Sequence, residues 1–333
     1  MKHHAIVLSC VLTCLLIGTR LIDAQTYQNP IISVSLPDPT VIRDNDGSYW
    51  LYATEDTRNV PIWHSTDLVH WTFSGTAFTD ATRPQMVPRG SIWAPDINKI
   101  SNKYVLYYSK SVWGGEWDCG IGVAIADQPQ GPFTDVGKLF LSQEIGVQNS
   151  IDPFFFADKG HNYLFWGSFH GIFGIELSED GLSIKDGAKK FQIAGGLTEG
   201  TALYKHGKYY YLIGSAGTCC QGAQSTYHLV VARSKNITGP YMNDKGEEAI
   251  QNGFTPFLHG SPSVAGPGHC SGIVKDDANK DWLIYHGYLA ENDGLGRVTF
   301  LDRIIWTKKG WPTIEQAMPS TTTKVPRIKG NNR

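Results

Sequence analysis

Five ionisable side chains recur along this chain at similar distances before a set of aromatic residues. They are Asp38, Asp96, Asp152, Glu199 and His269, and each lies 8 to 13 residues before the first aromatic residue of a short apolar run. A single Asp-Pro in such a Gly- and Pro-rich context would normally indicate only a turn. Because the same placement occurs five times, we expect these side chains to converge on one site.

Carboxylates that converge in a partly dry channel can perform acid–base chemistry. Burial and like-charge repulsion push their pKa values apart, so that one carboxyl group stays protonated while others are ionised. Glycoside hydrolysis needs this pairing, with an acid for the leaving oxygen and a base or nucleophile on the other face of the sugar. Rings such as Trp93, Trp113 and Phe169 could stack on sugars, and Trp166 could do so or pack in the core. The alternative is a calcium-binding or purely structural axis, which oxygen ligands also suit.

The elements that must position these residues are short strands, because helical periodicity is almost absent over residues 25–315. One unit recurs, a turn followed by an aromatic-rich strand, at residues 47–52, 102–107, 161–166, 207–212 and 280–285. The first aromatic residues of these copies are 55, 59, 46 and 73 residues apart. A repeat of this size, holding about four short strands, is typical of a β-propeller blade. We therefore predict an all-β, five-bladed β-propeller in a single domain, with a two-domain sandwich as the competing architecture.

Composition and charge narrow the function classes. The 333 residues include 29 Lys and Arg against 31 Asp and Glu, a net charge of −2, without any basic block. This balance excludes nucleic acid or an anionic membrane surface as the main partner. With 39 aromatic residues and only 18% charged residues, the bulk of the chain is not disordered.

The N-terminus resembles a secretory signal peptide over residues 1–24. Lys2 precedes a 14-residue apolar stretch from Ala5 to Gly18, and Ala24 is a small residue before the expected cut. The stretch is too short for a membrane span. We expect a secreted monomer, extracellular or periplasmic, with a catalytic domain at residues 25–318 and a polar tail at residues 319–333.

Removal of the signal peptide leaves four cysteines. Cys119, Cys219, Cys220 and Cys270 allow three pairings, and the sequence does not choose among them. The adjacent Cys219 and Cys220 could bridge each other only with strain, and buried free thiols remain an alternative. The sequence contains no Cys-x-x-Cys spacing, which argues against a zinc site.

Several motifs together resemble those of family 43 glycoside hydrolases, and within them the arabinanases that act on α-1,5-linked L-arabinofuranose. The resemblance runs from about Tyr27 to Ile314. It rests on Asp38-Pro39-Thr40-Val41, Ser91-Ile92-Trp93-Ala94-Pro95-Asp96, Asn149-Ser150-Ile151-Asp152-Pro153, Thr198-Glu199-Gly200, Gly217-Thr218-Cys219-Cys220 with Ser225-Thr226-Tyr227, and Gly268-His269. The fold of that family is a five-bladed β-propeller.

The resemblance implies a role for each carboxylate. Asp38 matches the general base that activates water, and Glu199 matches the general acid. Asp152 matches the residue that raises the pKa of the acid and orients it. The family inverts the anomeric centre, which requires acid and base to be roughly 6.5–9.5 Å apart.

The resemblance also implies substrate and metal contacts. His269 matches an axial histidine beside a calcium ion that is held largely through water. Arg303 could reach the substrate or close a structural ion pair, and both readings stay open. The residues expected to bind the polysaccharide substrate are Asp38, Trp93, Asp96, Gly114, Asn149, Ser150, Ile151, Asp152, Ser168, Phe169, His170 and Arg303.

The function expected from these motifs is endo-acting hydrolysis of arabinan. An exo-acting α-L-arabinofuranosidase or β-xylosidase of the same family is the alternative among enzymes. A non-catalytic sugar-binding propeller is the alternative from another class, and it would be expected to lack a catalytic carboxylate. The motifs of fructan-processing propellers are not matched.

Overall fold

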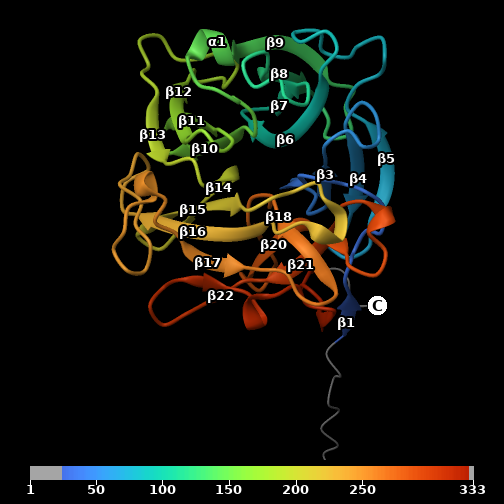
Figure 1. Ribbon diagram of the computed structural model, residues 1–333. Coiled ribbons are helices and arrows are strands. Elements are labelled where there is room, and N and C mark those ends of the chain that lie inside the picture. The colour runs from blue at the N-terminus through green and yellow to red at the C-terminus, as the bar shows by residue number, and fades with distance from the viewer. Residues whose placement is uncertain (1–24, 330–333) are drawn as a thin grey trace, which may run out of the picture.

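The computed structural model describes residues 25–329, so the predicted signal peptide lies outside the described residues. Within this range, five four-stranded antiparallel sheets stand around a ring, as Figure 1 shows. The chain is therefore a five-bladed β-propeller, and the prediction from the repeats is confirmed. No helix in residues 25–329 is long and apolar enough to cross a membrane.

Each blade is a sheet of strands that follow one another in sequence. Blade 1 contains β2 (Thr40–Arg43), β3 (Tyr49–Tyr52), β4 (Pro61–Ser65) and β5 (Thr72–Thr76). Blade 2 contains β6 (Ser91–Ile100), β7 (Lys103–Ser111), β8 (Gly120–Ala126) and β9 (Thr134–Leu141). Blade 3 contains β10 (Phe154–Asp158), β11 (His161–Trp166), β12 (Ile172–Leu177) and β13 (Phe191–Ala194). Blade 4 contains β14 (Glu199–His206), β15 (Tyr209–Ala216), β16 (His228–Ser234) and β17 (Thr255–Leu258).

Blade 5 departs from this order. Its first strand is interrupted, so that β18 (Val264–Gly268) and β19 (Val274–Lys275) both pair with β20 (Asp281–Leu289), and β21 (Val298–Arg303) pairs with the other edge of β20. The N-terminal segment extends this blade, because the backbone of Ile32 bridges that of Thr299 in β21. The first and last parts of the sequence therefore close the ring together.

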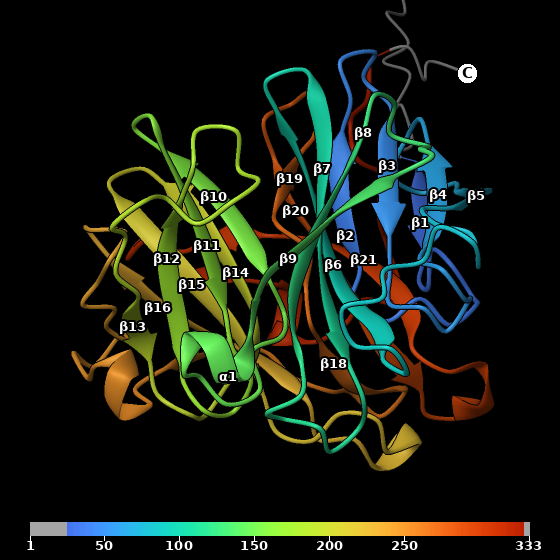
Figure 2. The same cartoon turned by 90° about the horizontal axis from the view of Figure 1, so that it is seen from above.

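The remaining elements are short. β1 (Thr26–Gln28) pairs with β24 (Thr322–Lys324), so part of the predicted C-terminal tail is a strand, and β22 (Ile305–Trp306) pairs with β23 (Pro312–Thr313). The helical segments are α1 (Ser142–Ile145) and the 3₁₀ turns η1 (Gly222–Gln224), η2 (Ala249–Gln251), η3 (Asp293–Leu295) and η4 (Glu315–Ala317). In Figure 2 the blades are seen from the side, with α1 at the end of β9.

The repeated aromatic segments are the second strands of the blades, β3, β7, β11, β15 and β20. Successive side chains of a strand point to opposite faces, and both faces of each second strand are buried here. Tyr49 and Leu51 of β3 pack toward blade 5, whereas Tyr52 packs toward blade 2. The same alternation gives a hydrophobic core between every pair of neighbouring blades. These cores hold the five sheets in a ring around the site.

Candidate active site

A cavity of about 210 Å³ is walled by residues from all five blades. It brings together Asp38, Asp152, Glu199 and His269, four of the five ionisable residues that the sequence singles out. The full lining is Asp38, Thr54, Asp56, Trp93, Trp113, Ile151, Asp152, Glu199, Cys219, Cys220, His269 and Arg297.

A left-handed backbone occurs at the same place in the blades. φ is 54° at Asp38, 60° at Asp152 and 43° at His269. Residues other than glycine hold this conformation at a cost of about 1–3 kcal/mol, and such strain clusters at functional sites. In blade 4 the left-handed residue is Gly200, with φ of 58°, directly after Glu199. A Cβ atom at Gly200 would lie 3.0 Å from the His269 ring, so the absence of a side chain here lets the two blades approach closely.

Asp96 does not line the cavity, which corrects the sequence prediction. In blade 2 the left-handed residue is Ala94, with φ of 40°, and Asp96 lies two residues further along β6 beyond a bulge. The Asp96 carboxylate accepts hydrogen bonds from the Phe155 backbone N–H at 2.7 Å and from Thr40 Oγ1 at 3.3 Å. Burial raises its pKa to about 7. Asp96 therefore links blades 1, 2 and 3 through hydrogen bonds beside the cavity and does not face the space in which a sugar would bind.

Asp38 stands in a strongly cationic environment. Its Oδ1 lies 3.1 Å from Arg297 Nη1 and 3.2 Å from His269 Nδ1, and its Oδ2 accepts a 2.6 Å hydrogen bond from Thr54 Oγ1. Burial by itself would raise the pKa of this carboxyl, but Arg297 and then His269 hold the pKa well below its usual range. Asp38 is therefore ionised, as a general base must be.

Two histidines flank Asp38 and have opposite charge states. Burial would lower the pKa of His269, but the charges of Asp38 and Asp152 raise it to about 9, so this ring is protonated at neutral pH. His286 is fully buried and accepts a 3.0 Å hydrogen bond from the Asp38 backbone N–H through Nδ1. Burial and Arg297 lower the pKa of His286, which keeps it neutral.

Glu199 is held through both carboxyl oxygens. Ser168 Oγ contacts Oε2 at 2.5 Å, and Tyr227 Oη donates to Oε1 at 2.8 Å. Burial raises the pKa of Glu199 although these two hydroxyl groups oppose the shift, and the charge of Asp38 adds to it. A carboxyl group with a raised pKa can keep its proton near neutral pH and can act as an acid.

Asp152 connects the blade that carries it to the start of β14. Its Oδ2 accepts a 3.1 Å hydrogen bond from the Gly200 backbone N–H, and its own backbone N–H donates to Ser109 Oγ at 2.8 Å. Burial raises the pKa of Asp152 to about 7, opposed by His269 and reinforced by the charge of Glu199. Asp152 thus anchors the backbone beside Glu199, and the two carboxyl groups interact electrostatically.

Two tryptophans from blade 2 form an aromatic wall. Trp93 and Trp113 meet edge to face, with ring centroids 6.4 Å apart, and Trp113 is 82% exposed. Gly114 follows Trp113 with φ of 79°, in open space. An exposed indole beside buried carboxylates offers a flat face on which a sugar ring can stack.

Some residues predicted to bind substrate stand behind the wall instead. Asn149 Nδ2 donates to Ser168 Oγ at 2.9 Å, and Ser168 in turn contacts Glu199, so this pair orients the acid. Ser150 is fully buried and accepts a hydrogen bond from Trp166 Nε1, so Trp166 belongs to the core. Ile151 lines the cavity.

Phe169 and His170 do not line the cavity either. Phe169 is 37% exposed, and its backbone N–H donates to the Thr198 carbonyl at 3.1 Å. His170 Nε2 lies 3.1 Å from Glu116 Oε2 at the surface. Both residues follow Ser168 in the loop between β11 and β12, next to the segment that leads into Glu199.

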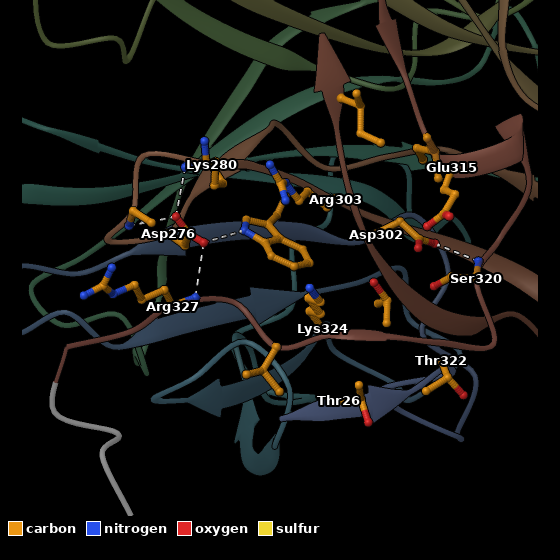
Figure 3. A pocket seen from close by; sticks show the side chains of 16 residues that line it. Thr26, Asp276, Lys280, Asp302, Arg303, Glu315, Ser320, Thr322, Lys324 and Arg327 are labelled. Carbon is orange, nitrogen blue, oxygen red and sulfur yellow. Dashed lines mark hydrogen bonds between the residues drawn. The ribbon is translucent and has the colours of Figure 1, made fainter. Parts of the chain in front are cut away.

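Arg303 lies outside the site, and Arg297 occupies the place that the sequence prediction gave to an arginine of the last blade. The two arginines are six residues apart at opposite ends of β21, a separation of roughly 20 Å along a strand. The register pairs Val298 with Gly287, next to His286, but pairs Arg303 with Trp282. Figure 3 shows Arg303 in a different cavity with Asp276 and Lys280.

The sequence analysis missed several groups at the site, among them Arg297, Thr54, His286 and the hydroxyl group of Tyr227. Tyr227 stands in the Ser225-Thr226-Tyr227 motif, which gave a signal without a role. Arg297 and Thr54 gave none, because their contacts with Asp38 span 259 and 16 residues of sequence.

The described residues supply few ligands for a metal ion. Within residues 25–329, no group of three or more His, Cys, Asp or Glu side chains could hold one. His269 Nδ1 faces Asp38, and the protonated ring has no lone pair to offer a metal ion, so an ion beside it would have to be held through water. Calcium takes six to eight oxygen ligands, so an ion here would depend on water for most of them.

The geometry therefore combines an ionised carboxylate, a carboxyl group with a raised pKa and an exposed aromatic wall in one cavity. The combination of a base, an acid and a stacking surface is what hydrolysis of a glycosidic bond requires. A five-bladed propeller with this site belongs to the class of propeller glycosidases.

Comparisons with known proteins identify the family. The profile of glycosyl hydrolases family 43 matches residues 27–312. An extracellular exo-α-(1→5)-L-arabinofuranosidase of Cellvibrio japonicus is 31% identical over 310 residues, which cover 85% of this chain and 87% of that protein. An extracellular endo-α-(1→5)-L-arabinanase of Bacillus subtilis is 33% identical over 291 residues, which cover 84% and 87%. The structure of a Cellvibrio cellulosa α-L-arabinanase complexed with arabinohexaose superposes with a TM-score of 0.77 at 30% identity, covering 85% of this chain and 96% of that one.

The chain belongs to glycosyl hydrolase family 43. It is a glycoside hydrolase, and the family resemblance inferred from its motifs is confirmed.

Proposed function

We propose that this protein is an arabinanase that hydrolyses α-1,5-linked L-arabinofuranosyl bonds within arabinan, with inversion of the anomeric centre. The observation that carries the proposal is that the pKa of Asp38 is lowered and the pKa of Glu199 is raised within one cavity. The names of the relatives support the choice of substrate, because both endo- and exo-acting enzymes on α-1,5-linked L-arabinose are among them.

In the proposed reaction, Glu199 donates its proton to the oxygen of the leaving sugar. Asp38 accepts a proton from a water molecule, which attacks the anomeric carbon on the opposite face of the ring. A single displacement inverts the configuration, and no bond forms between enzyme and sugar. Asp152 positions the backbone next to Glu199 through the hydrogen bond from the Gly200 N–H, and its proposed role is to raise the pKa of the acid when it is ionised.

Other residues of the site prepare the base and the sugar chain before the bond is cleaved. Arg297 and protonated His269 keep Asp38 ionised before the water is activated. Trp113 offers its exposed face to the sugar rings that extend beyond the cavity.

Exo-acting cleavage is the second candidate, because the relative from Cellvibrio japonicus with 31% identity is named an exo-α-(1→5)-L-arabinofuranosidase. The two modes of cleavage are distinguished by hydrolysing linear arabinan and measuring the size of the products during the first few per cent of the reaction. Endo action gives a mixture of oligosaccharides from the start. A single small product from the start would contradict the endo assignment. Branched arabinan in a parallel reaction measures tolerance of side chains.

Glu199→Ala serves as the inactive control for that assay. A proton NMR time course on a short arabino-oligosaccharide, read before mutarotation, gives the configuration of the first product. A first product that retains the configuration would overturn the inverting mechanism, but it would not affect the assignment of arabinan as the substrate.

We also propose that the protein is secreted and that its signal peptide is removed after Ala24. Two of its relatives are named extracellular, and residues 1–24 carry the signal pattern. N-terminal sequencing of protein recovered from the medium should begin at Gln25. Protein that stays in the cells with Met1 would contradict this proposal.

A further inference from the structure

Two adjacent cysteines face the same cavity as the proposed acid and base. Cys219 and Cys220 stand in the loop between β15 and β16 and line the cavity with Asp38 and Glu199. Their sulfur atoms are 2.6 Å apart. Neither thiol has a role in the hydrolysis proposed above.

Backbone contacts fix the loop that carries the two thiols. The Thr218 backbone N–H donates to Thr226 Oγ1 at 3.0 Å, and the Tyr227 N–H donates to the Thr218 carbonyl at 3.1 Å. Beyond the cysteines, the Ala223 N–H donates to Asp293 Oδ2 in blade 5 at 2.9 Å. The loop is therefore tied down on both sides of the pair, which keeps the two sulfur atoms next to each other.

The environments of the two thiols differ. The hydrogen bond from Cys219 lowers the pKa of Cys220, burial opposes this shift, and the positive charge of Arg297 supports it. The same hydrogen bond and burial raise the pKa of Cys219. The thiolate is the reactive form of cysteine, so Cys220 is suited to attack and Cys219 to complete an exchange.

The other two cysteines do not compete for this pairing. Cys119 and Cys270 are both buried, and Cys119 Sγ contacts Ser142 Oγ at 3.2 Å. Among the cysteines that the structure describes, only Cys219 and Cys220 have sulfur atoms in contact.

We propose that Cys219 and Cys220 form a redox-active pair that closes to a disulfide between adjacent residues, and that this disulfide forms part of the wall of the sugar-binding cavity. The second half of the proposal rests on the proposed function. The oxidant is a low-molecular-weight disulfide such as oxidised glutathione. The Cys220 thiolate attacks one of its sulfur atoms and releases one thiolate. The Cys219 thiol then displaces the second thiol and closes the bridge, so that two thiols are oxidised and one disulfide is reduced.

This bridge should be easy to reduce. Disulfides usually join Cα atoms about 5.5–6 Å apart, whereas adjacent Cα atoms are about 3.8 Å apart across a trans peptide. Strained bridges have more oxidising potentials and are the labile ones. Closure replaces two thiols, which can donate hydrogen bonds, with an apolar surface against the substrate. Reduction therefore changes the chemistry of the wall without changing Asp38 or Glu199.

The covalent state is tested on the full protein without any activity measurement. Protein secreted into medium is denatured without reductant, treated with iodoacetamide and digested with trypsin, which releases residues 209–233 as one peptide. The expected peptide is unalkylated and lighter by two hydrogen atoms than the dithiol form, and dithiothreitol followed by oxidised glutathione opens and restores the bridge. A peptide that carries two alkyl groups before reduction overturns the proposal. So does a Cys219 or Cys220 linked to Cys119 or Cys270.

The effect on the cavity is tested by kinetics with linear arabino-oligosaccharides. Reduction should raise KM by about tenfold, the lower end of the effect of one lost apolar contact in a substrate pocket, with a smaller change in kcat. Cys219→Ser and Cys220→Ser should each behave like the reduced enzyme and no longer respond to dithiothreitol. Cys119→Ser is the matched control, because it removes a thiol outside the pair and should keep the response.

The outcomes separate this proposal from the proposed function. If the peptide is bridged but KM is the same in both redox states, the cavity-wall role is wrong. If arabinan is not hydrolysed at all, the proposed function fails while the alkylation result still decides the bridge. Circular-dichroism melting curves of both serine variants exclude misfolding as the cause of a raised KM.

Discussion

Replacing Arg297 tests how the fold keeps Asp38 ionised. Arg297 Nη1 lies 3.1 Å from Asp38 Oδ1, and both side chains are largely buried. Opposite charges about 4 Å apart at an effective dielectric constant of about 20 attract each other by about 4 kcal/mol. This attraction is large enough to lower the pKa of Asp38 although burial raises it. Arg297→Gln keeps a polar side chain of similar length but removes the charge.

The expected result is a higher pKa for Asp38, because the charge of Arg297 that lowers it is lost while His269 remains. Asp38 acts as a base only when it is ionised. Activity should therefore be lost as the pH falls through the raised pKa, at a pH where the wild type is still active. The assay is the pH dependence of kcat/KM on a linear arabino-oligosaccharide, which reports groups of the free enzyme.

Arg303→Gln is the matched control, since it removes an arginine from the other end of β21 and should leave the acidic limb in place. An acidic limb at the same pH in Arg297→Gln and in the wild type would refute the reasoning. A loss of kcat/KM by the same factor at every pH would instead assign Arg297 to substrate binding alone.

Four further predictions follow from the site. Glu199→Ala should abolish hydrolysis of poor leaving groups but spare activated aryl glycosides, and equal losses on both, measured as kcat/KM, would remove Glu199 from the acid role. Asp38→Ala should lose several orders of magnitude on every substrate, and azide should restore turnover with a glycosyl azide of inverted configuration; mass spectrometry that finds a trapped glycosyl-enzyme would argue against a single displacement. Ser168→Ala removes a hydrogen bond that lowers the pKa of Glu199, so the alkaline limb of the pH profile should move to higher pH, whereas an unmoved limb would mean that Ser168 does not act on the acid. Prolonged EDTA treatment should lower both activity and melting temperature, calcium should restore them, and His269→Ala should no longer respond to EDTA; a wild type that EDTA leaves unchanged would contradict the calcium prediction.

Local pattern was sufficient to predict the fold and three of the side chains in the cavity that carry the proposed chemistry. The aromatic segments alternate between the two faces of a strand, and turn residues bound them, so each copy could be recognised without knowledge of its neighbours. Asp38, Asp152 and Glu199 each stand in a motif before such a segment, and the order of the blades brings them to one cavity. Their roles came from the family resemblance and remain proposals.

Tertiary structure decided the details that depend on register and on contacts between distant residues. In blade 2 Ala94 rather than Asp96 takes the left-handed position that Asp38 and Asp152 occupy in their blades, and β6 bulges between Trp93 and Asp96. Arg297 directly precedes β21 and Arg303 ends it, and the pairing of β21 with β20 places Arg297 beside Asp38 and Arg303 in another cavity. The charge state of Asp38 likewise depends on an arginine 259 residues away. A pKa is set by whatever lies within a few ångströms, and only the folded ring brings those groups together.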